Sequence, residues 1–297
     1  MDASDLRIFE AVARLGGMNR AAAEINTVQS NVTARVRALE QELGVPLFRR
    51  HSRGVALTPA GERLLPYAKR TAHLLDDARR AVADDGAPKG QLMIGSLEST
   101  AAASLRLSPL LAAYVKAYPD VDVVLRTGTT SELIAGVLER RLEGAFVCGP
   151  VDHPEIEKEV VFRENLVVLT APAVKGLDVL AQKGDVRIIV LRVGCSYRQR
   201  LEEILARRGV VAPRRLEFGS LDAIVGCVAA GLGVTLLPKS LIGPIWGDGR
   251  VAVHALSAAE SRVDTLFIRR RDGLVSSALA AFLKCVRPVL ARAQAAE

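Results

Sequence analysis

The stretch "NTVQSNVTARVRALE", residues 26–40, decides how the N-terminal part of the chain is interpreted. No acidic residue lies between Glu24 and Glu40, and the polar side chains are amides, hydroxyls and two arginines. Apolar residues recur at helical spacing, which predicts one amphipathic helix. Its buried stripe is predicted to consist of Val32, Val36, Leu39 and Leu43. The opposite, acid-free face must therefore meet solvent or a partner.

The composition of that face suits a surface that approaches DNA closely. Ala34 and Ala38 lie in its middle, where long side chains would hold the helix away from a groove. The residues able to hydrogen-bond gather toward its N-terminal end, the end that a recognition helix presents to base edges. Amides can pair with adenine and arginines with guanine. Taken alone, the pattern is equally typical of a solvated helix face. The segments on either side of it must therefore distinguish a DNA contact from a solvated surface.

Two predicted helices precede the stretch. The first spans Ser4–Leu15, with Ser4 as its N-cap, and ends at Gly16-Gly17. The second spans Met18–Ile25, and Asn26-Thr27 forms the turn. Two short helices, a tight turn and a third helix that ends at Gly44 predict a helix-turn-helix.

A basic hairpin is predicted next, in "LFRRHSRGVALTPAG", residues 47–61. A basic run, a glycine and alternating apolar residues are typical of a small β-hairpin, here called the wing. Residues 1–70 hold eleven Lys or Arg against seven Asp or Glu, within a chain of net charge +7. This excess permits a nucleic-acid partner.

Thr58-Pro59 is predicted to be the N-cap and first turn of a long helix. The linker "DDGAPKG", residues 84–90, ends it. Its apolar stripe could pack on its own domain, but steps of three and four over this length favour a partner helix. A two-fold dimer would also reach two major grooves about 34–36 Å apart. The stripe contains Ala60, Leu64, Tyr67, Thr71, Leu74, Ala78 and Val82.

After Gly90 the pattern changes to alternating strands and helices, which predicts parallel α/β sheets in two lobes with a cleft between them. The predicted strands are 91–95, 121–126, 144–148, 166–170, 188–193, 216–218, 234–237 and 263–269. The predicted helices are 101–118, 131–141, 197–208, 221–230 and 276–292.

Three strand-to-helix junctions carry hydroxyls where such a cleft binds ligands, beyond the C-terminal strand ends. Free amides at a helix N-terminus favour an anion, typically a carboxylate, although Ser and Thr also cap ordinary helices there. Cys195 at the third junction is either a small polar residue or a redox-sensitive thiol. The candidate effector residues are Ser99, Thr100, Thr129, Thr130, Ser196, Tyr197 and Arg198.

Other classes of function find little support. The four cysteines and four histidines show no metal-ligand spacing, and no catalytic motif is present, so we expect no enzyme, no cofactor and no metal site. No signal segment or membrane-spanning run is evident, which argues against a transported-solute receptor of similar fold. We expect a cytoplasmic protein.

Residues 6–61 resemble the winged helix-turn-helix of LysR-type transcriptional regulators. The resemblance rests on "LRIFEAVARLGGMNRAAAEI" and "VQSNVTARVRALEQELGVPLFRRHSRGVALTPAG", whose Ala-Ala pair, "LEQELGVPLF", basic wing and "LTPAG" stand in the family's order. It extends over essentially the whole chain. Ser30-Asn31 replaces a common Pro-Ala and Thr33 a common Ser, so a base preference cannot be carried over.

The resemblance implies a fold in three parts. These are a winged helix-turn-helix over residues 1–58, a dimerising linker helix over 59–89 and a bilobal, periplasmic-binding-protein-like α/β effector domain over 90–297. Lobe I is expected at about 90–161 and 268–297, and lobe II at about 162–267.

The function implied is sequence-specific regulation of transcription, in which an anionic or carboxylate effector alters DNA bending. Promoter DNA, the effector and further copies of the chain are the expected partners, with a homodimer formed through antiparallel linker helices, or a homotetramer. RNA polymerase is a further candidate partner. Ser99, Thr100 and Thr129 are the leading effector positions. The candidate DNA-binding residues are Gln29, Ser30, Asn31, Thr33, Arg35, Arg37, Arg50 and Arg53.

Overall fold

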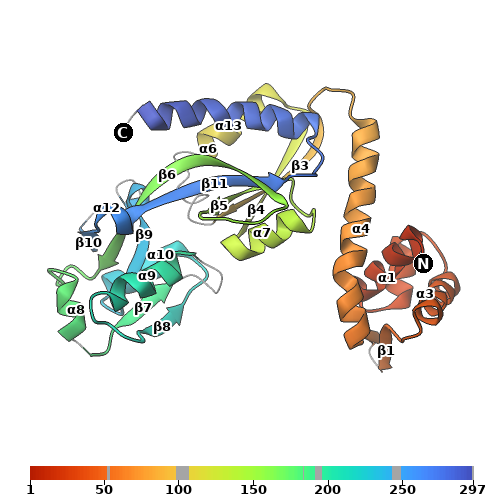
Figure 1. Ribbon diagram of the computed structural model, residues 1–297, viewed down its shortest axis with the longest axis horizontal. Helices are drawn as coiled ribbons and strands as arrows, with labels where there is room; N and C mark the ends of the chain where they lie inside the picture. The colour runs from red at the N-terminus through yellow and green to blue at the C-terminus, as the bar shows by residue number, and fades with distance from the viewer. Residues whose placement is uncertain (52–53, 98–106, 183, 191–195, 243–248, 296–297) are drawn as a thin grey trace. The chain divides into compact units, whose positions relative to one another are not determined.

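The computed structural model describes residues 1–51, 54–97, 107–182, 184–190, 196–242 and 249–295 (Figure 1). The chain forms two compact units. The N-terminal unit contains Met1–Asp85 together with Glu139–Arg141, and the C-terminal unit contains the remainder from Gly86. Each has hydrophobic cores of its own.

Three helices open the N-terminal unit: α1 (Ala3–Leu15), α2 (Met18–Glu24) and α3 (Gln29–Leu43). The predicted N-cap of α1 at Ser4 is wrong. Asp2 accepts a hydrogen bond from the amide of Asp5 (2.8 Å), and Asp5 accepts one from the amide of Asp2 (2.9 Å), which satisfies both amides reciprocally.

The buried stripe of α3 is one residue shorter than predicted. Val32, Val36 and Leu39 are at most 3% exposed, whereas Leu43 is 37% exposed. Leu43 is the last residue of the helix and lies a full turn beyond Leu39. Gly44, in the left-handed conformation (φ 68°), ends the helix as predicted.

The wing consists of β1 (Phe48–His51) and β2 (Gly54–Leu57), paired antiparallel as predicted. Thr58 caps the long helix α4 (Pro59–Ala83) by accepting a hydrogen bond from the amide of Gly61 (3.1 Å). The predicted apolar stripe of α4 is packed at its N-terminal end and exposed further along the helix. Ala60 and Leu64 pack on the core of their own unit, whereas the later large apolar positions are exposed, with Val82 at 90%.

The C-terminal unit begins with alternating strands and helices. Strands β3, β4 and β5 are mutually parallel in the order β4-β3-β5. The elements are β3 (Gly90–Leu97), α6 (Leu107–Ala117), β4 (Val121–Gly128), α7 (Thr130–Leu138) and β5 (Gly144–Cys148).

Two long antiparallel strands then run side by side through the unit, β6 (Ile156–Thr170) and β11 (Arg262–Arg270) (Figure 1). β11 is also antiparallel to β5, so the sheet is mixed, and the predicted parallel arrangement holds for β3, β4 and β5 but not for β6 and β11. The prediction also captured only the last five residues of β6. Charged residues crowd its first half, "IEKEVVFREN", and conceal the strand period.

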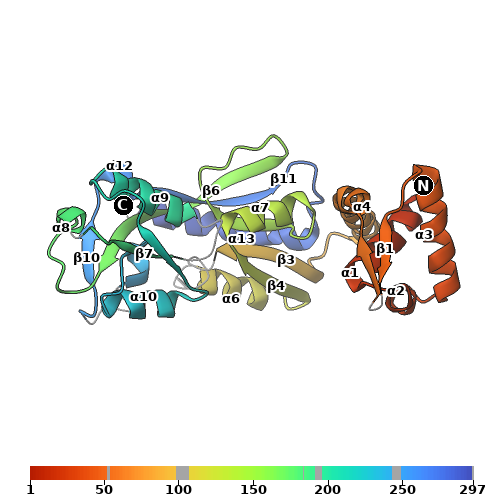
Figure 2. The same ribbon diagram turned by 90° about the horizontal axis from the view of Figure 1, so that it is seen from below.

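The second half of β6 belongs to lobe II, where it pairs with β9 and β10. Figure 2 shows α9 and α10 on opposite sides of β7. Side chains of β7 alternate between them, because Ile188 and Val190 join one core and Ile189 another. The remaining elements are α8 (Asp178–Gln182), β7 (Arg187–Val190), α9 (Ser196–Ala206), β8 (Arg214–Glu217), α10 (Leu221–Ala229), β9 (Thr235–Pro238), the short 3₁₀ helix η1 (Lys239–Leu241), β10 (Ala252–Ala255), α12 (Ala258–Ser261) and α13 (Ser277–Ala295).

The core of lobe I joins segments that lie far apart in the sequence. Helices α6 and α13 cover one face of the sheet and α7 the other (Figure 1). Beneath α6 and α13, the ring of Phe267 lies 5.0 Å from that of Phe146 and 5.9 Å from that of Phe282. Gly144 borders this aromatic cluster, and a Cβ added to it would lie 2.2 Å from Phe267 Cζ.

Candidate DNA interface and effector cleft

The acid-free face of α3 is open in the N-terminal unit. Its alanines, Ala34 and Ala38, are exposed between polar side chains. Gln29, Ser30, Asn31 and Arg37 are exposed, and Thr33 and Arg35 are half-buried.

Two hydrogen bonds hold the amides on this face. Gln29 Nε2 donates to Thr33 Oγ1 (3.1 Å), and Asn31 Nδ2 donates to Thr27 Oγ1 (3.0 Å). An amide group has two N–H donors and one carbonyl acceptor. Each side chain is therefore oriented while it keeps one donor and its acceptor for a partner.

The N-terminus of α3 differs from those of α1 and α4. Its N-cap position is Val28, no side chain caps it, and no acid lies in its first turn. Its amides therefore face outward with the positive end of the helix dipole. Val28 itself is 64% exposed, a feature that the sequence analysis did not single out because an apolar residue beside a turn carries no recognisable signal.

Arg35 is occupied within the unit. Its Nη2 lies 3.0 Å from Asp2 Oδ1 and its Nε 2.7 Å from Asp5 Oδ1. These ion pairs tie α3 to the first turn of α1. The described geometry therefore does not support the predicted DNA contact of Arg35.

The wing is anchored to the turn between α1 and α2. Val55 N donates to the carbonyl oxygen of Gly16 (3.2 Å). Gly54 has φ +140°, and a Cβ there would lie 2.4 Å from the same oxygen, so only glycine fits. The backbone of Arg50 lies in β1, but its side chain, like the whole of Arg53, is outside what the structure describes.

In the C-terminal unit, two helix N-termini from different lobes meet. Ser196 Oγ, which opens α9, donates to Thr130 Oγ1, which opens α7 (3.1 Å). Thr129 caps α7, since its amide donates to Glu132 Oε2 (2.8 Å) and its hydroxyl accepts from the amide of Glu132 (3.3 Å). Ser99, Thr100 and Cys195 lie outside the described residues.

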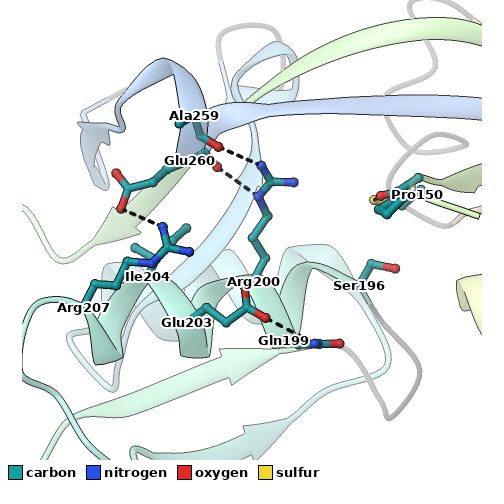
Figure 3. Close-up of a pocket in the computed structure, with 11 residues that line it drawn as sticks. Pro150, Ser196, Gln199, Arg200, Glu203, Ile204, Arg207, Ala259 and Glu260 are labelled. Atoms are coloured by element: carbon teal, nitrogen blue, oxygen red, sulfur yellow. Dashed lines mark hydrogen bonds and ion pairs between the residues drawn. The ribbon is translucent and has the colours of Figure 1, made fainter.

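A cavity of about 420 Å³ extends from Ser196 along α9 (Figure 3). Arg200 crosses from α9 to the chain around α12, where Nε donates to the carbonyl of Glu260 (3.0 Å) and Nη2 to that of Arg262 (2.7 Å). The cavity is lined by Cys148, Gly149, Pro150, Ser196, Gln199, Arg200, Glu203, Ile204, Arg207, Ala259 and Glu260.

The charged side chains that line this cavity are two arginines, Arg200 and Arg207, and two glutamates, Glu203 and Glu260. Arg208 binds both carboxylate oxygens of Glu260 (2.8 and 3.0 Å) and holds the pKa of Glu260 down at about 2. Glu203 accepts a hydrogen bond from Gln199. Arg200 donates to neutral carbonyls, so its charge is not cancelled by a carboxylate. Arg207 Nη1 also lies 3.9 Å from Glu260 Oε1, so the charge of Arg207 is partly compensated, whereas the guanidinium of Arg200 is held by carbonyl oxygens.

Two of the predicted effector residues point elsewhere. Tyr197 is 6% exposed and belongs to the hydrophobic core. Arg198 pairs with Glu202 (3.4 Å) and Glu217 (2.9 Å). The described geometry therefore does not support effector contacts for Tyr197 and Arg198.

The cavity face of α9, by contrast, was missed by the sequence analysis. It carries Gln199, Arg200 and Glu203, and Arg207 follows directly after the helix. Steps of three and four from Ser196 would have identified this face as one polar stripe.

Within the described parts of the chain, no helix is long and apolar enough to cross a membrane, and no cluster of three metal-binding side chains occurs. The cysteines found there, Cys148, Cys227 and Cys285, form no disulfide with one another.

A winged helix-turn-helix with an open recognition helix, accompanied by a two-lobed α/β unit with a charged cavity, defines a class: DNA-binding proteins that respond to a small molecule. The comparisons with known proteins agree. Residues 3–62 match the model of the bacterial regulatory helix-turn-helix protein, lysR family, and residues 85–291 match the LysR substrate binding domain. The chain belongs to the LysR family, whose members are transcriptional regulators and not enzymes.

Relatives and solved structures cover nearly the full length. The HTH-type transcriptional regulator GltR of Bacillus subtilis is 43% identical over 95% of both chains. CzcR of Bacillus cereus is 38% identical over 96% of this chain and 97% of its own. Full-length CbnR, solved with its target DNA, is 25% identical over 97% of this chain and 100% of its own, with a TM-score of 0.66. A full-length OxyR variant from Pseudomonas aeruginosa shares the fold, with 20% identity, a TM-score of 0.67 and coverage of 98% and 94%.

Proposed function

We propose that this LysR-family regulator reads a specific DNA sequence through α3 and changes the bend of that DNA when an anionic effector binds between its lobes. The proposal that α3 reads DNA rests on its acid-free face, which has Ala34 and Ala38 at its centre. Its exposed amides, its uncapped N-terminus and the solved complex of CbnR with target DNA support it. Effector binding must favour one lobe arrangement over another to have an effect.

The roles divide by side-chain chemistry. Gln29, Ser30, Asn31 and Thr33 lie in the first turns of α3 and are assigned to base edges. Arg37, Arg50 and Arg53 are assigned to phosphates, which set register without reading sequence. Exposed Val28 adds an apolar contact suited to a thymine methyl group.

Gln29→Ala is expected to reduce discrimination about tenfold between the duplex that wild-type protein selects from a random pool and a random duplex. A bidentate pairing with a base contributes about 1–3 kcal/mol of discrimination, and alanine cannot form it. Arg37→Ala should weaken binding to both duplexes by the same factor and lower the salt slope of binding by about one. Fluorescence anisotropy over a salt series measures both. Equal losses on both duplexes for Gln29→Ala would remove Gln29 as a base reader, and a wild-type protein that selects no duplex would overturn the proposed function.

An anionic effector, typically a carboxylate, suits the cleft for two reasons. The first turn of α9 holds no acid, and its N-terminus opens onto the cavity at Ser196. Glu132 already compensates the N-terminus of α7, so the available positive end is that of α9. The charge of Arg200, whose guanidinium is held by carbonyl oxygens, adds to it, and about 420 Å³ accommodates a small metabolite.

A screen of small carboxylic acids by thermal shift should identify acids that raise the melting temperature of the full-length protein. The uncharged amide of each hit should stabilise at least about tenfold more weakly, because it lacks the anion. Arg207→Ala should weaken the response, whereas Arg187→Ala should not, because the Arg187 side chain pairs with Asp185 outside the cavity. An amide that stabilises as well as its acid would rule out the anionic assignment.

The assembly proposed is a homodimer through antiparallel α4 helices, extending to a tetramer. The exposed stripe on α4 supports it, because Tyr67, Leu74 and Val82 are 61%, 52% and 90% exposed. The same proposal includes three further points. The three parts of the chain are divided at residues 58 and 89, and RNA polymerase is a further partner. Ser99 and Thr100 contact the effector.

A further inference from the structure

The acid-free stretch ends at Glu40, and the side chain of Glu40 has a specific use. Its Oε1 accepts hydrogen bonds from the amide of Leu47 (2.7 Å) and from the amide of Phe48 (3.1 Å). Glu40 lies in α3, whereas Phe48 is the first residue of β1. One carboxylate oxygen thus joins the recognition helix to the point where the wing begins.

The same short segment is held from its other side by the start of α4. Thr58 N donates to the carbonyl of Leu47 (2.9 Å), and Thr58 Oγ1 donates to that of Pro46 (2.7 Å). A Cβ on Gly61 would lie 2.3 Å from the oxygen of Leu47, so the two backbones are in close contact. The Leu47 side chain is 1% exposed in the core. The amides of the segment therefore face α3 and its carbonyls face α4.

We infer that Glu40 is a positioning residue for DNA binding, because it sets where the wing departs from the recognition helix. This inference rests on the proposed DNA interface, in which α3 and the wing contact one duplex together. Base contacts from α3 and phosphate contacts from the wing form simultaneously only if the distance between the two is fixed. Glu40 fixes it by binding two amides at the root of β1.

Charge and position make opposite predictions for this residue. A carboxylate beside DNA is repelled by phosphates, so removing its charge alone should strengthen binding slightly. The positioning role needs only an acceptor oxygen that reaches both amides. Glutamine keeps that oxygen without the charge, alanine lacks it, and aspartate keeps the charge but is one methylene too short.

The experiment compares full-length wild type with Glu40→Gln, Glu40→Asp and Glu40→Ala. Glu42→Ala, an exposed acid two residues away, is the matched control. The probes are the duplex that wild-type protein selects and a random duplex of equal length, titrated over a salt series. Glu40→Ala should bind the selected duplex at least about tenfold more weakly, and its salt slope should fall by about one for each phosphate that the wing no longer neutralises. Glu40→Asp should show the same changes more weakly, while Glu40→Gln and Glu42→Ala stay within about threefold of wild type.

Several outcomes would overturn the inference. If Glu40→Gln and Glu40→Ala lost equal affinity for the selected duplex, the effect would be due to the charge of Glu40. An unchanged salt slope in Glu40→Ala would show that Glu40 does not affect the phosphate contacts of the wing. Thermal melting of each variant shows whether the protein is folded at the assay temperature, and Glu40→Asp provides the readout if Glu40→Ala does not fold. Failure of wild-type protein to select any duplex is a separate result, which concerns the proposed function.

Discussion

Ala34→Glu is expected to lower the affinity for the selected duplex by at least about 100-fold, close to 3 kcal/mol. Ala34 is exposed in the middle of the α3 face. A glutamate there would separate the helix from the groove floor and bring a carboxylate to the phosphates. The fold should be unaffected, because the site is exposed and glutamate is a good helix former.

Two controls isolate the cause of this loss. Ala34→Lys introduces a side chain of similar length with the opposite charge, so it should lose selectivity but keep affinity for random DNA. Ala206→Glu places the same side chain on an exposed position of α9 and should leave DNA binding unchanged. Anisotropy titrations of the three variants measure the effect. A wild-type affinity for Ala34→Glu would show that this face of α3 does not lie against DNA.

Gly144→Ala is expected to destabilise lobe I by about 3 kcal/mol, which is the upper part of the range for overpacked cores. The new methyl group would lie 2.2 Å from Phe267 Cζ. The ring cannot move aside, because Phe146 and Phe282 pack against it. Hydrogen exchange of the β5 amides in the full-length chain reports the free energy of local opening without assuming that both units unfold together.

A double-mutant cycle tests the steric cause. Phe267→Leu alone should also destabilise the lobe, because it leaves a cavity beside Phe146. Combined with Gly144→Ala, it makes room for the methyl group, so the double variant should be more stable than the sum of both losses by at least about 1 kcal/mol. Strictly additive losses would mean that contact with Phe267 is not what makes glycine necessary at position 144.

The DNA-binding part was predicted well because its signals are local. Helical spacing identified Val32, Val36 and Leu39, and glycine and threonine marked the helix boundaries. One miss is a local competition that sequence cannot decide. Asp2 and Ser4 are both competent N-caps, and the choice depends on the reciprocal bond with Asp5. Arg35 was expected at the DNA, and its ion pairs with Asp2 and Asp5 are tertiary contacts that the sequence does not indicate.

The C-terminal unit was predicted less well because its signals are not local. The pairing of β11 with both β5 and β6 joins segments that lie far apart in the chain. The first half of β6 is charged because much of it faces solvent, so its strand period was concealed. The cavity residues on α9 become recognisable as a site only once Pro150 and Glu260 lie opposite them.

The aromatic cluster of lobe I has a consequence for the order in which a newly made chain can fold. The N-terminal unit draws almost entirely on the first 85 residues, so its helices can fold while the ribosome is still adding lobe II. Lobe I begins at β3 but lacks Phe267 and Phe282 until translation is nearly complete. Every nascent molecule therefore passes through a stage in which the DNA-reading part is finished and the ligand-sensing part still exposes much of its core. Premature termination before α13 would yield chains that retain a recognition helix but cannot complete lobe I.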